Sequence, residues 1–169
     1  MRLRDILLTS VCSLALAAPA VAQTTYTAVL TSASEVPTNG SAATGNATVV
    51  LNAAQTQISI SCQFQNLVGT YSASHIHGPA PVGTNASVKW GFLPPTAPWV
   101  FSNANHDGTV SNFVVAGITA TDVSNLNAGL MYVNVHSSQF PGGEIRGQLG
   151  SQPTPTTSTT WGRVKRLFR

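Results

Sequence analysis

Apolar and polar residues alternate along several short stretches of the chain. The clearest stretch runs from Ile58 to Gln65, where Ile, Ile, Cys and Phe alternate with Ser, Ser, Gln and Gln. Residues 48–52 and 131–136 show the same alternation. Because successive side chains of a strand point to opposite faces of a sheet, this period predicts half-buried antiparallel strands. Further strands are expected over residues 26–31, 73–77, 88–92, 99–101, 109–115 and 144–149.

Clusters of Gly, Pro, Asn and Ser separate these segments. About eight or nine short strands at this spacing predict an all-β fold, either a β-sandwich or a flattened barrel. One short helix is also expected. Thr121 is predicted to cap a helical turn that starts at Asp122, passes Leu126 and closes at Gly129.

The first 22 residues have the pattern of a secretory signal peptide. Arg2 and Arg4 precede an apolar run over residues 6–18, and Ala20-Val21-Ala22 supplies the small residues of a cleavage site. We expect cleavage after Ala22 and a secreted, periplasmic or extracellular location. The rest of the sequence has no run of about 20 apolar residues, so no transmembrane segment is expected in the mature chain.

The last 19 residues differ in composition from the rest. Residues 151–160 read SQPTPTTSTT, which predicts a linker with nothing apolar to bury. Residues 161–169 read WGRVKRLFR, and two interpretations stay open for them. They are either a basic amphipathic tail that touches a membrane or another protein, or a solvated tail too short to hold a helix. The folded domain is therefore expected over residues 23–150.

The charge of the expected domain excludes one class of partner. Only 8% of the chain is charged. Residues 23–150 hold two basic residues, Lys89 and Arg146, and four acidic ones, so the net charge of this part is −2. Two cations cannot neutralise a run of phosphates, so nucleic acid is not an expected partner. Cys62, the single cysteine left after cleavage, alternates with apolar residues and is expected to be a buried thiol.

Four histidines are the candidate ligands for a metal ion. His75 and His77 flank Ile76, so on a strand they share one face. His136 ends another predicted strand, and His106 lies in a polar segment that predicts a loop. Neutral imidazoles favour copper or zinc over calcium or magnesium. The alternative is that these histidines only form ordinary hydrogen bonds within the sheet.

Glu144 and Arg146 follow the strand of His136 and are expected to share one face of the next strand. Arg146 and Glu144 would then lie behind the metal ligands and fix the orientation of a ligand or of an approaching small anion. The alternative is that Arg146 only pairs with Glu144 or another carboxylate. The sequence has no G-x-S-x-G, no P-loop and no G-x-G-x-x-G after a strand, and no catalytic residue is assigned.

Three segments resemble a known family, the CHRD domain first named from chordin. They are YTAVLTSASEVP (26–37), ASHIHGPA (73–80) and YVNVHSSQFPGGEIRGQL (132–149). The resemblance covers about residues 25–149. It implies an extracytoplasmic, all-β domain with an immunoglobulin-like or Greek-key sandwich, and it implies no reaction.

A weaker resemblance concerns copper/zinc superoxide dismutase. That family also has an H-x-H pair on a strand, a late strand that ends in His, and a Gly-Gly-x-x-Arg-like element. The resemblance implies copper ligands at His75, His77 and His136, with His106 as a fourth candidate and Arg146 as a guiding residue. No His/Asp-rich loop follows His77 and no cysteine pair is present, so no zinc subsite is expected.

These observations lead to three hypotheses. The first is a secreted CHRD domain that binds copper through its histidines and serves copper handling or redox protection in the envelope. The second is a non-catalytic module for an extracellular protein partner, with the segment FLPPTAPWVF (92–101), which contains Trp99, and the nearby Trp90 as contacts. The alternative for both tryptophans is that they simply pack onto the sandwich. The third is a copper-only enzyme similar to superoxide dismutase.

Overall fold

The computed structural model describes residues 22–151. The predictions for a signal peptide and for the linker and tail fall on residues 1–21 and 152–169, outside the described part. The strands are β1 (Thr24–Thr31), β2 (Thr44–Leu51), β3 (Gln57–Gln65), β4 (Tyr71–His77), β5 (Val88–Gly91), β6 (Val100–Ser102), β7 (Asp107–Ala116), β8 (Tyr132–Ser137), β9 (Ile145–Gln148) and β10 (Gly150–Ser151). One helix, α1 (Ala120–Asn127), and two 3-10 turns, Ser32–Ser34 and Asn103–Asn105, complete the elements.

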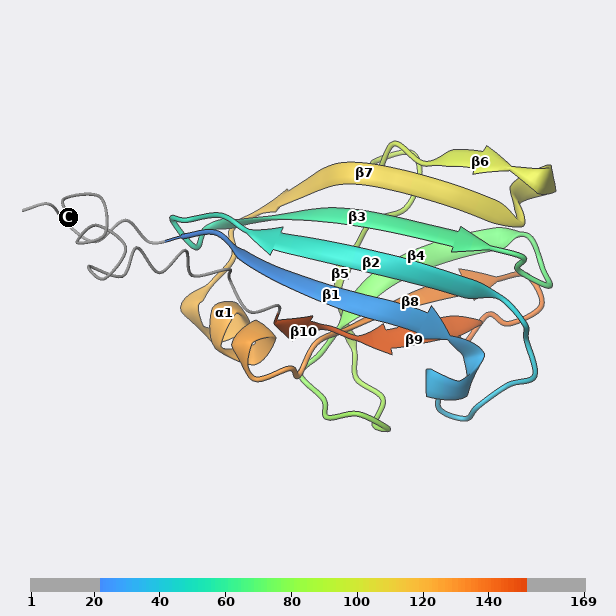
Figure 1. Cartoon of the computed structure of the whole chain (residues 1–169), viewed down its shortest axis with the longest axis horizontal. Helices are drawn as coiled ribbons and strands as arrows, with labels where there is room; N and C mark the ends of the chain where they lie inside the picture. The colour runs from blue at the N-terminus through green and yellow to red at the C-terminus, as the bar shows by residue number, and fades with distance from the viewer. Residues whose placement is uncertain (1–21, 152–169) are drawn as a thin grey trace, which may run out of the picture.

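All the strands belong to one antiparallel sheet. Its order is β5-β4-β8-β9-β1-β2-β3-β7-β6, and β10 pairs with the start of β1. The sheet curls so that β4, β5 and β8 pass behind β1, β2 and β3 (Figure 1). The two halves are joined where Thr31 of β1 pairs with Arg146 of β9. The all-β prediction is confirmed, and the shape is that of a flattened barrel.

The core lies between the two halves and follows the predicted alternation. On β3, Ile58, Ile60, Cys62 and Phe64 are at most 3% exposed, while Gln63 and Gln65 face solvent. Cys62 is a free, buried thiol, as predicted, and burial raises its pKa to about 12. The outer side of β2, β3 and β7, called the open face below, is exposed to solvent.

Strand β8 departs from the prediction of a half-buried strand. All six of its residues are buried, the polar ones included. The reason is that loops lie over the outer side of β4, β8 and β9, called the covered face below. Hydrogen bonds hold these loops in place. The Asn134 amide nitrogen donates to the Glu35 carboxyl group, and His136 Nδ1 donates to the Pro141 carbonyl oxygen. The Tyr132 hydroxyl accepts from the Ala86 backbone N–H. The covered face is therefore a second, polar interior.

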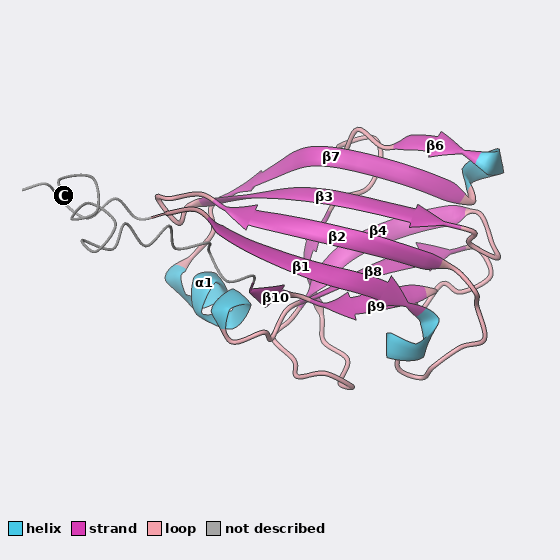
Figure 2. Cartoon of the chain, viewed as in Figure 1, coloured by secondary structure: helices cyan, strands magenta, loops and turns pink. Residues whose placement is uncertain are grey.

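Helix α1 lies at the end of the barrel where β10 is found (Figure 2). Its cap is Thr119, two residues before the predicted Thr121. The Thr119 hydroxyl accepts from the Asp122 backbone N–H, and the Asp122 carboxylate accepts from the Thr119 backbone N–H, which is a capping box. Val123 and Leu126 are buried against the core, and no helix of residues 22–151 has the length and apolarity needed to cross a bilayer.

Candidate metal centre

Three of the four histidines meet on the covered face. His75 and His77 lie two residues apart on β4, and His136 lies on the neighbouring β8. One ring nitrogen from each of them lies within 4.8 Å of the others. His75 Nδ1 lies 3.0 Å from His136 Nε2 and donates a hydrogen bond to it in the metal-free chain, because the proton of His136 is on Nδ1. Two nitrogens on one metal ion, each at a bond length of about 2.0–2.1 Å, are at most about 4.2 Å apart, so little adjustment would let all three bind one ion.

Backbone carbonyls set the orientation of two of these rings. His77 Nδ1 lies 3.0 Å from the Ala86 carbonyl oxygen, and His136 Nδ1 lies 2.9 Å from the Pro141 carbonyl oxygen. Because a carbonyl oxygen can only accept, each Nδ1 carries the proton. Each neutral ring then presents the lone pair of Nε2 to the cluster. This is how metal-binding histidines are usually oriented, with the second nitrogen bonded to a fixed acceptor.

The Nε2 atom of His77 has no hydrogen-bond partner although it is buried. Buried polar atoms are nearly always satisfied, and leaving one without a partner costs about 1–3 kcal/mol. The lone pair of His77 Nε2 points into a group of imidazoles and lacks a donor among residues 22–151. A water O–H or a metal cation would satisfy this lone pair, and a cation would at the same time engage the two neighbouring imidazoles.

The surroundings keep the three rings uncharged. Burial, and then the neighbouring His136 and His77, lower the pKa of His75 to about 4. Burial lowers the pKa of His77 and of His136 as well, against an opposing effect of their bonds to Ala86 and Pro141. Since only a neutral imidazole can donate a lone pair to a metal, these shifts leave the ligands available at neutral pH.

Arg146 contacts the cluster through Tyr132 and is not exposed to solvent. Its guanidinium lies 3.4 Å from the centre of the Tyr132 ring, and Tyr132 stacks in turn on His77 with 4.9 Å between ring centres. Its nitrogens donate to Asn85 Oδ1 and to the Thr84 carbonyl oxygen. Arg146 is 2% exposed. Its stacking through Tyr132 on His77 fits the expected role of fixing a ligand's orientation, whereas its burial and engaged donors do not fit guidance of an anion from solvent.

Glu144 belongs to a different group of residues. Its carboxylate accepts hydrogen bonds from the hydroxyls of Ser41 and Ser137 and from the backbone N–H of Val68. No ion pair joins it to Arg146 within residues 22–151, where the salt bridge present is that of Lys89 with Asp122. The expected pairing of Arg146 with Glu144 is therefore wrong for the part of the chain that the structure describes.

His106 also lies apart from the cluster. Its Nδ1 donates to the Leu67 carbonyl oxygen at 2.5 Å, and its own carbonyl accepts from the Leu67 N–H. These bonds hold the turn before β7 against the turn after β3. The prediction of His106 as a fourth ligand is wrong, because the two hydrogen bonds fix it to a separate loop pair.

Trp90 and Trp99 are half-buried and pack against the core. Trp99 Nε1 donates to the Phe92 carbonyl oxygen at 2.6 Å, and its ring stacks on those of Phe92 and Phe101. In the fold, both tryptophans therefore pack the barrel. The sequence had left two roles open for them, packing and contact with a partner.

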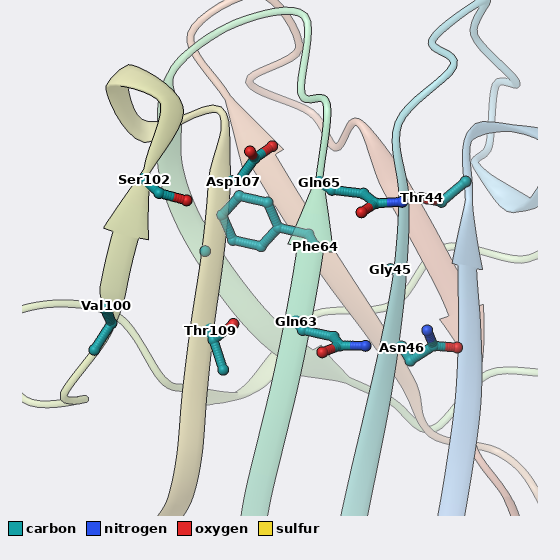
Figure 3. Close-up of a pocket in the computed structure, with 11 residues that line it drawn as sticks. Thr44, Gly45, Asn46, Gln63, Phe64, Gln65, Val100, Ser102, Asp107 and Thr109 are labelled. Atoms are coloured by element: carbon teal, nitrogen blue, oxygen red, sulfur yellow. Dashed lines mark hydrogen bonds between the residues drawn. The ribbon is translucent and has the colours of Figure 1, made fainter.

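A hollow of about 350 Å³ lies on the opposite side of the barrel, on the open face (Figure 3). Its side chains are mostly neutral hydroxyls and amides, such as Thr44, Asn46, Gln63 and Thr109. Asp107 is its one carboxylate, and it accepts from the Asn66 N–H at 2.7 Å. Without a histidine, a cysteine or a second carboxylate in its lining, this hollow offers no metal site.

The sequence reasoning gave no role to three residues of the covered face. The period of the strand does place Tyr132 and Asn134 on the same face as His136. Glu35 lies about a hundred residues away in the chain, and its carboxylate accepts from Asn134 Nδ2 at 2.6 Å. Nothing in the sequence pattern pointed to that contact.

Comparisons with known proteins agree with this architecture. The family model of the CHRD domain matches residues 26–149, which is nearly all of the described part. No curated protein and no solved structure matches the chain.

Proposed function

The chain belongs to the CHRD domain family, and we propose that it is an extracellular module that binds one copper ion through His75, His77 and His136. Family membership supports the extracellular setting. The copper site is the more specific part of the proposal, together with a role in copper handling or redox protection in the envelope.

The observation that carries the proposal is the unpartnered Nε2 of His77. This atom is buried beside two other imidazole nitrogens, and its orientation is fixed by the bond from Nδ1 to Ala86. A purely structural histidine would be expected to satisfy both nitrogens. In the metal-free chain the lone pair of His136 Nε2 accepts from His75 Nδ1, and that of His77 Nε2 has no partner, so a bound cation would give all three rings one common partner.

The donor set favours copper among the metals. All three ligands are imidazoles, with no carboxylate and no thiolate in the group. Imidazole suits copper and zinc, and the affinity of a given nitrogen site for divalent metals is highest for Cu²⁺. When bound, copper would supply one-electron redox chemistry. The residues of the chain would hold the ion, keep its ligands neutral and shield two of the three rings from water.

The experiment is a copper titration of the purified chain with a competing chelator, followed by calorimetry and by electron paramagnetic resonance of the Cu(II) form. We expect one copper per chain with nitrogen hyperfine structure. His77→Ala should lower the affinity by roughly 100-fold or more, because it removes a ligand whose supporting contacts alone are worth about 10–100-fold. His106→Ala is the matched control, and it should leave the affinity unchanged. The proposal fails if wild-type protein binds no stoichiometric copper or if the two variants behave alike.

A dismutase-like activity is not part of the proposal. The resemblance to copper/zinc superoxide dismutase gave Arg146 the task of guiding the anion, and that residue is buried with its donors engaged. No residue of the covered face takes its place as an exposed cation.

A further inference from the structure

A second buried atom on the covered face lacks a partner. Among residues 22–151, the buried side-chain nitrogens and oxygens without a hydrogen bond are His77 Nε2 and Asn134 Oδ1. Asn134 is 3% exposed. Two such atoms in one polar layer call for a common explanation, because each alone is costly to bury.

Asn134 lies directly opposite one of the three histidines and on the same face as the other two. It is paired with His75 across the β4–β8 ladder, and His136 lies two residues further along the same strand. His77 is paired with Tyr132, two residues in the other direction. Side chains directly opposite each other on one face are separated by about 4.5–5.5 Å at Cβ, and diagonal neighbours by about 7–8 Å. The amide therefore lies on the same face as the ligands, beside His75.

The orientation of the amide follows from its one hydrogen bond. Asn134 Nδ2 donates to Glu35 Oε1 at 2.6 Å. The nitrogen therefore faces Glu35, and Oδ1 is left as the acceptor. Gly143 makes room for this pair, since a Cβ at that position would collide with Asn134 Nδ2 and with both Glu35 oxygens. Glu35 is itself 5% exposed, so a buried carboxyl group fixes the amide nitrogen of Asn134.

We infer that Asn134 selects the non-protein ligand of the metal: its free Oδ1 requires a hydrogen-bond donor, so the site takes a water molecule in preference to a small anion. The inference rests on the proposed metal site and specifies what completes it. Water on the ion can donate a proton to Oδ1 and satisfy the second unpartnered atom. Azide or a halide has no hydrogen to offer, and it would leave Oδ1 buried without a partner beside the Glu35 carboxylate.

The test compares water and azide as ligands of the Cu(II)-loaded chain. Bound water is measured by the enhancement of solvent-proton relaxation per copper, and azide by titration under electron paramagnetic resonance. We expect wild-type protein to show relaxation enhancement from an exchangeable water. Its spectrum should stay unchanged at azide concentrations that saturate aqueous Cu(II)–imidazole.

The variant Asn134→Leu removes the acceptor with little change in volume. It should lose most of the water enhancement and gain azide affinity by roughly tenfold, the effect expected when one unsatisfied buried acceptor is removed. Asn134→Asp keeps an acceptor oxygen and should keep the water. The matched control is Asn46→Leu on the open face, where the same substitution meets solvent and should change neither reading.

The outcomes separate this inference from the proposed function. If wild-type protein binds copper through three nitrogens but its spectrum responds to azide, or if Asn134→Leu relaxes water as wild type does, the role of Asn134 is overturned and the copper site stands. If wild-type protein binds no copper, the proposed function itself is wrong. Should Asn134→Leu fail to fold, the wild-type water and azide readings decide alone.

Discussion

The open face and the covered face carry the same sequence pattern and have opposite environments. On the open face, Asn46, Gln63 and Thr109 stand in water above an apolar inner side. On the covered face, Asn134, His136 and Arg146 occupy equivalent outward positions and are 2–8% exposed. The difference comes from loops: the covered face is overlaid by the segments around residues 35–41, 78–87 and 139–144, which hydrogen-bond to it.

Covering a polar face changes what each side chain must do. In water an amide or hydroxyl is satisfied by solvent, whereas under a loop it needs a partner within the protein. Arg146, Tyr132 and Glu144 find theirs in loop backbone and hydroxyl groups. The atoms left unsatisfied gather at the histidines, which is where a bound ion and its water would supply the missing partners.

The largest loss of stability is expected when the buried Arg146 of the covered face is replaced, and the more exposed Lys89 on β5 provides the comparison. Arg146→Ala should lower the free energy of unfolding by about 3 kcal/mol, because it leaves Asn85 Oδ1 and the Thr84 carbonyl oxygen unpaired and removes the stacking on Tyr132. Lys89→Ala is the comparison: Lys89 is 37% exposed, and its buried partner Asp122 keeps the hydrogen bonds from Thr119, so the loss should be smaller, about 1 kcal/mol. Urea denaturation of both variants measures the contrast, and equal losses would contradict the idea of a second interior.

The protonation of Glu35 makes the stability of the covered face depend on pH, which exposed residues of the open face would not do. Burial raises the pKa of Glu35 from 4.5 to about 7, against the lowering effects of Arg146 and of the Val36 N–H. A raised carboxyl pKa gives stability that is fully present below pH 4.5 and is lost as the pH rises through 7. Glu35→Gln stays neutral and keeps an acceptor for Asn134. Its stability relative to wild type should therefore improve by about 2 kcal/mol between pH 5 and pH 8, a value reduced for residual solvent screening.

Thermal unfolding of the metal-free proteins at the two pH values measures this effect. The histidines titrate in both proteins, so their contributions cancel in the difference. A difference between Glu35→Gln and wild type that does not change with pH would mean that Glu35 is solvated like a residue of the open face.

The smallest effect is expected on the open face itself. Gln63→Ala removes an exposed amide whose neighbours are other solvated side chains, so the free energy of unfolding should change by no more than about 0.5 kcal/mol. The measurement is the same urea denaturation. A loss of the size expected for Arg146→Ala would show that the open face is covered in solution.

The elements were largely predictable because they depend on local periodicity. Residues 58–64 alternate strictly, and their apolar members became the core of β3. The helix was predicted in the right place, but its cap was assigned to Thr121 because Thr119 and Thr121 offer the same hydroxyl. The choice depends on which of them has a carboxylate three residues later, and that residue is Asp122.

The candidate site was predictable only in part. The H-x-H spacing placed His75 and His77 on one face, and the strand ending in His136 was recognised. The pairing of β4 with β8, which brings His136 to the other two, depends on which strands become neighbours in the sheet, and no residue pattern encodes that choice directly. His106 and Glu144 were assigned wrongly for the same reason, since hydrogen bonds to Leu67 and to Ser41 place them in other groups.

The sequence by itself determined which residues form strands, which side of each strand is apolar, and that three segments are typical of a CHRD domain. These properties follow from side-chain period and local composition. The tertiary structure decided which polar faces meet water and which are enclosed, because enclosure depends on loops that return from 50 to 100 residues away in the chain. That enclosure leaves His77 Nε2 and Asn134 Oδ1 without partners, and the candidate metal centre follows from it.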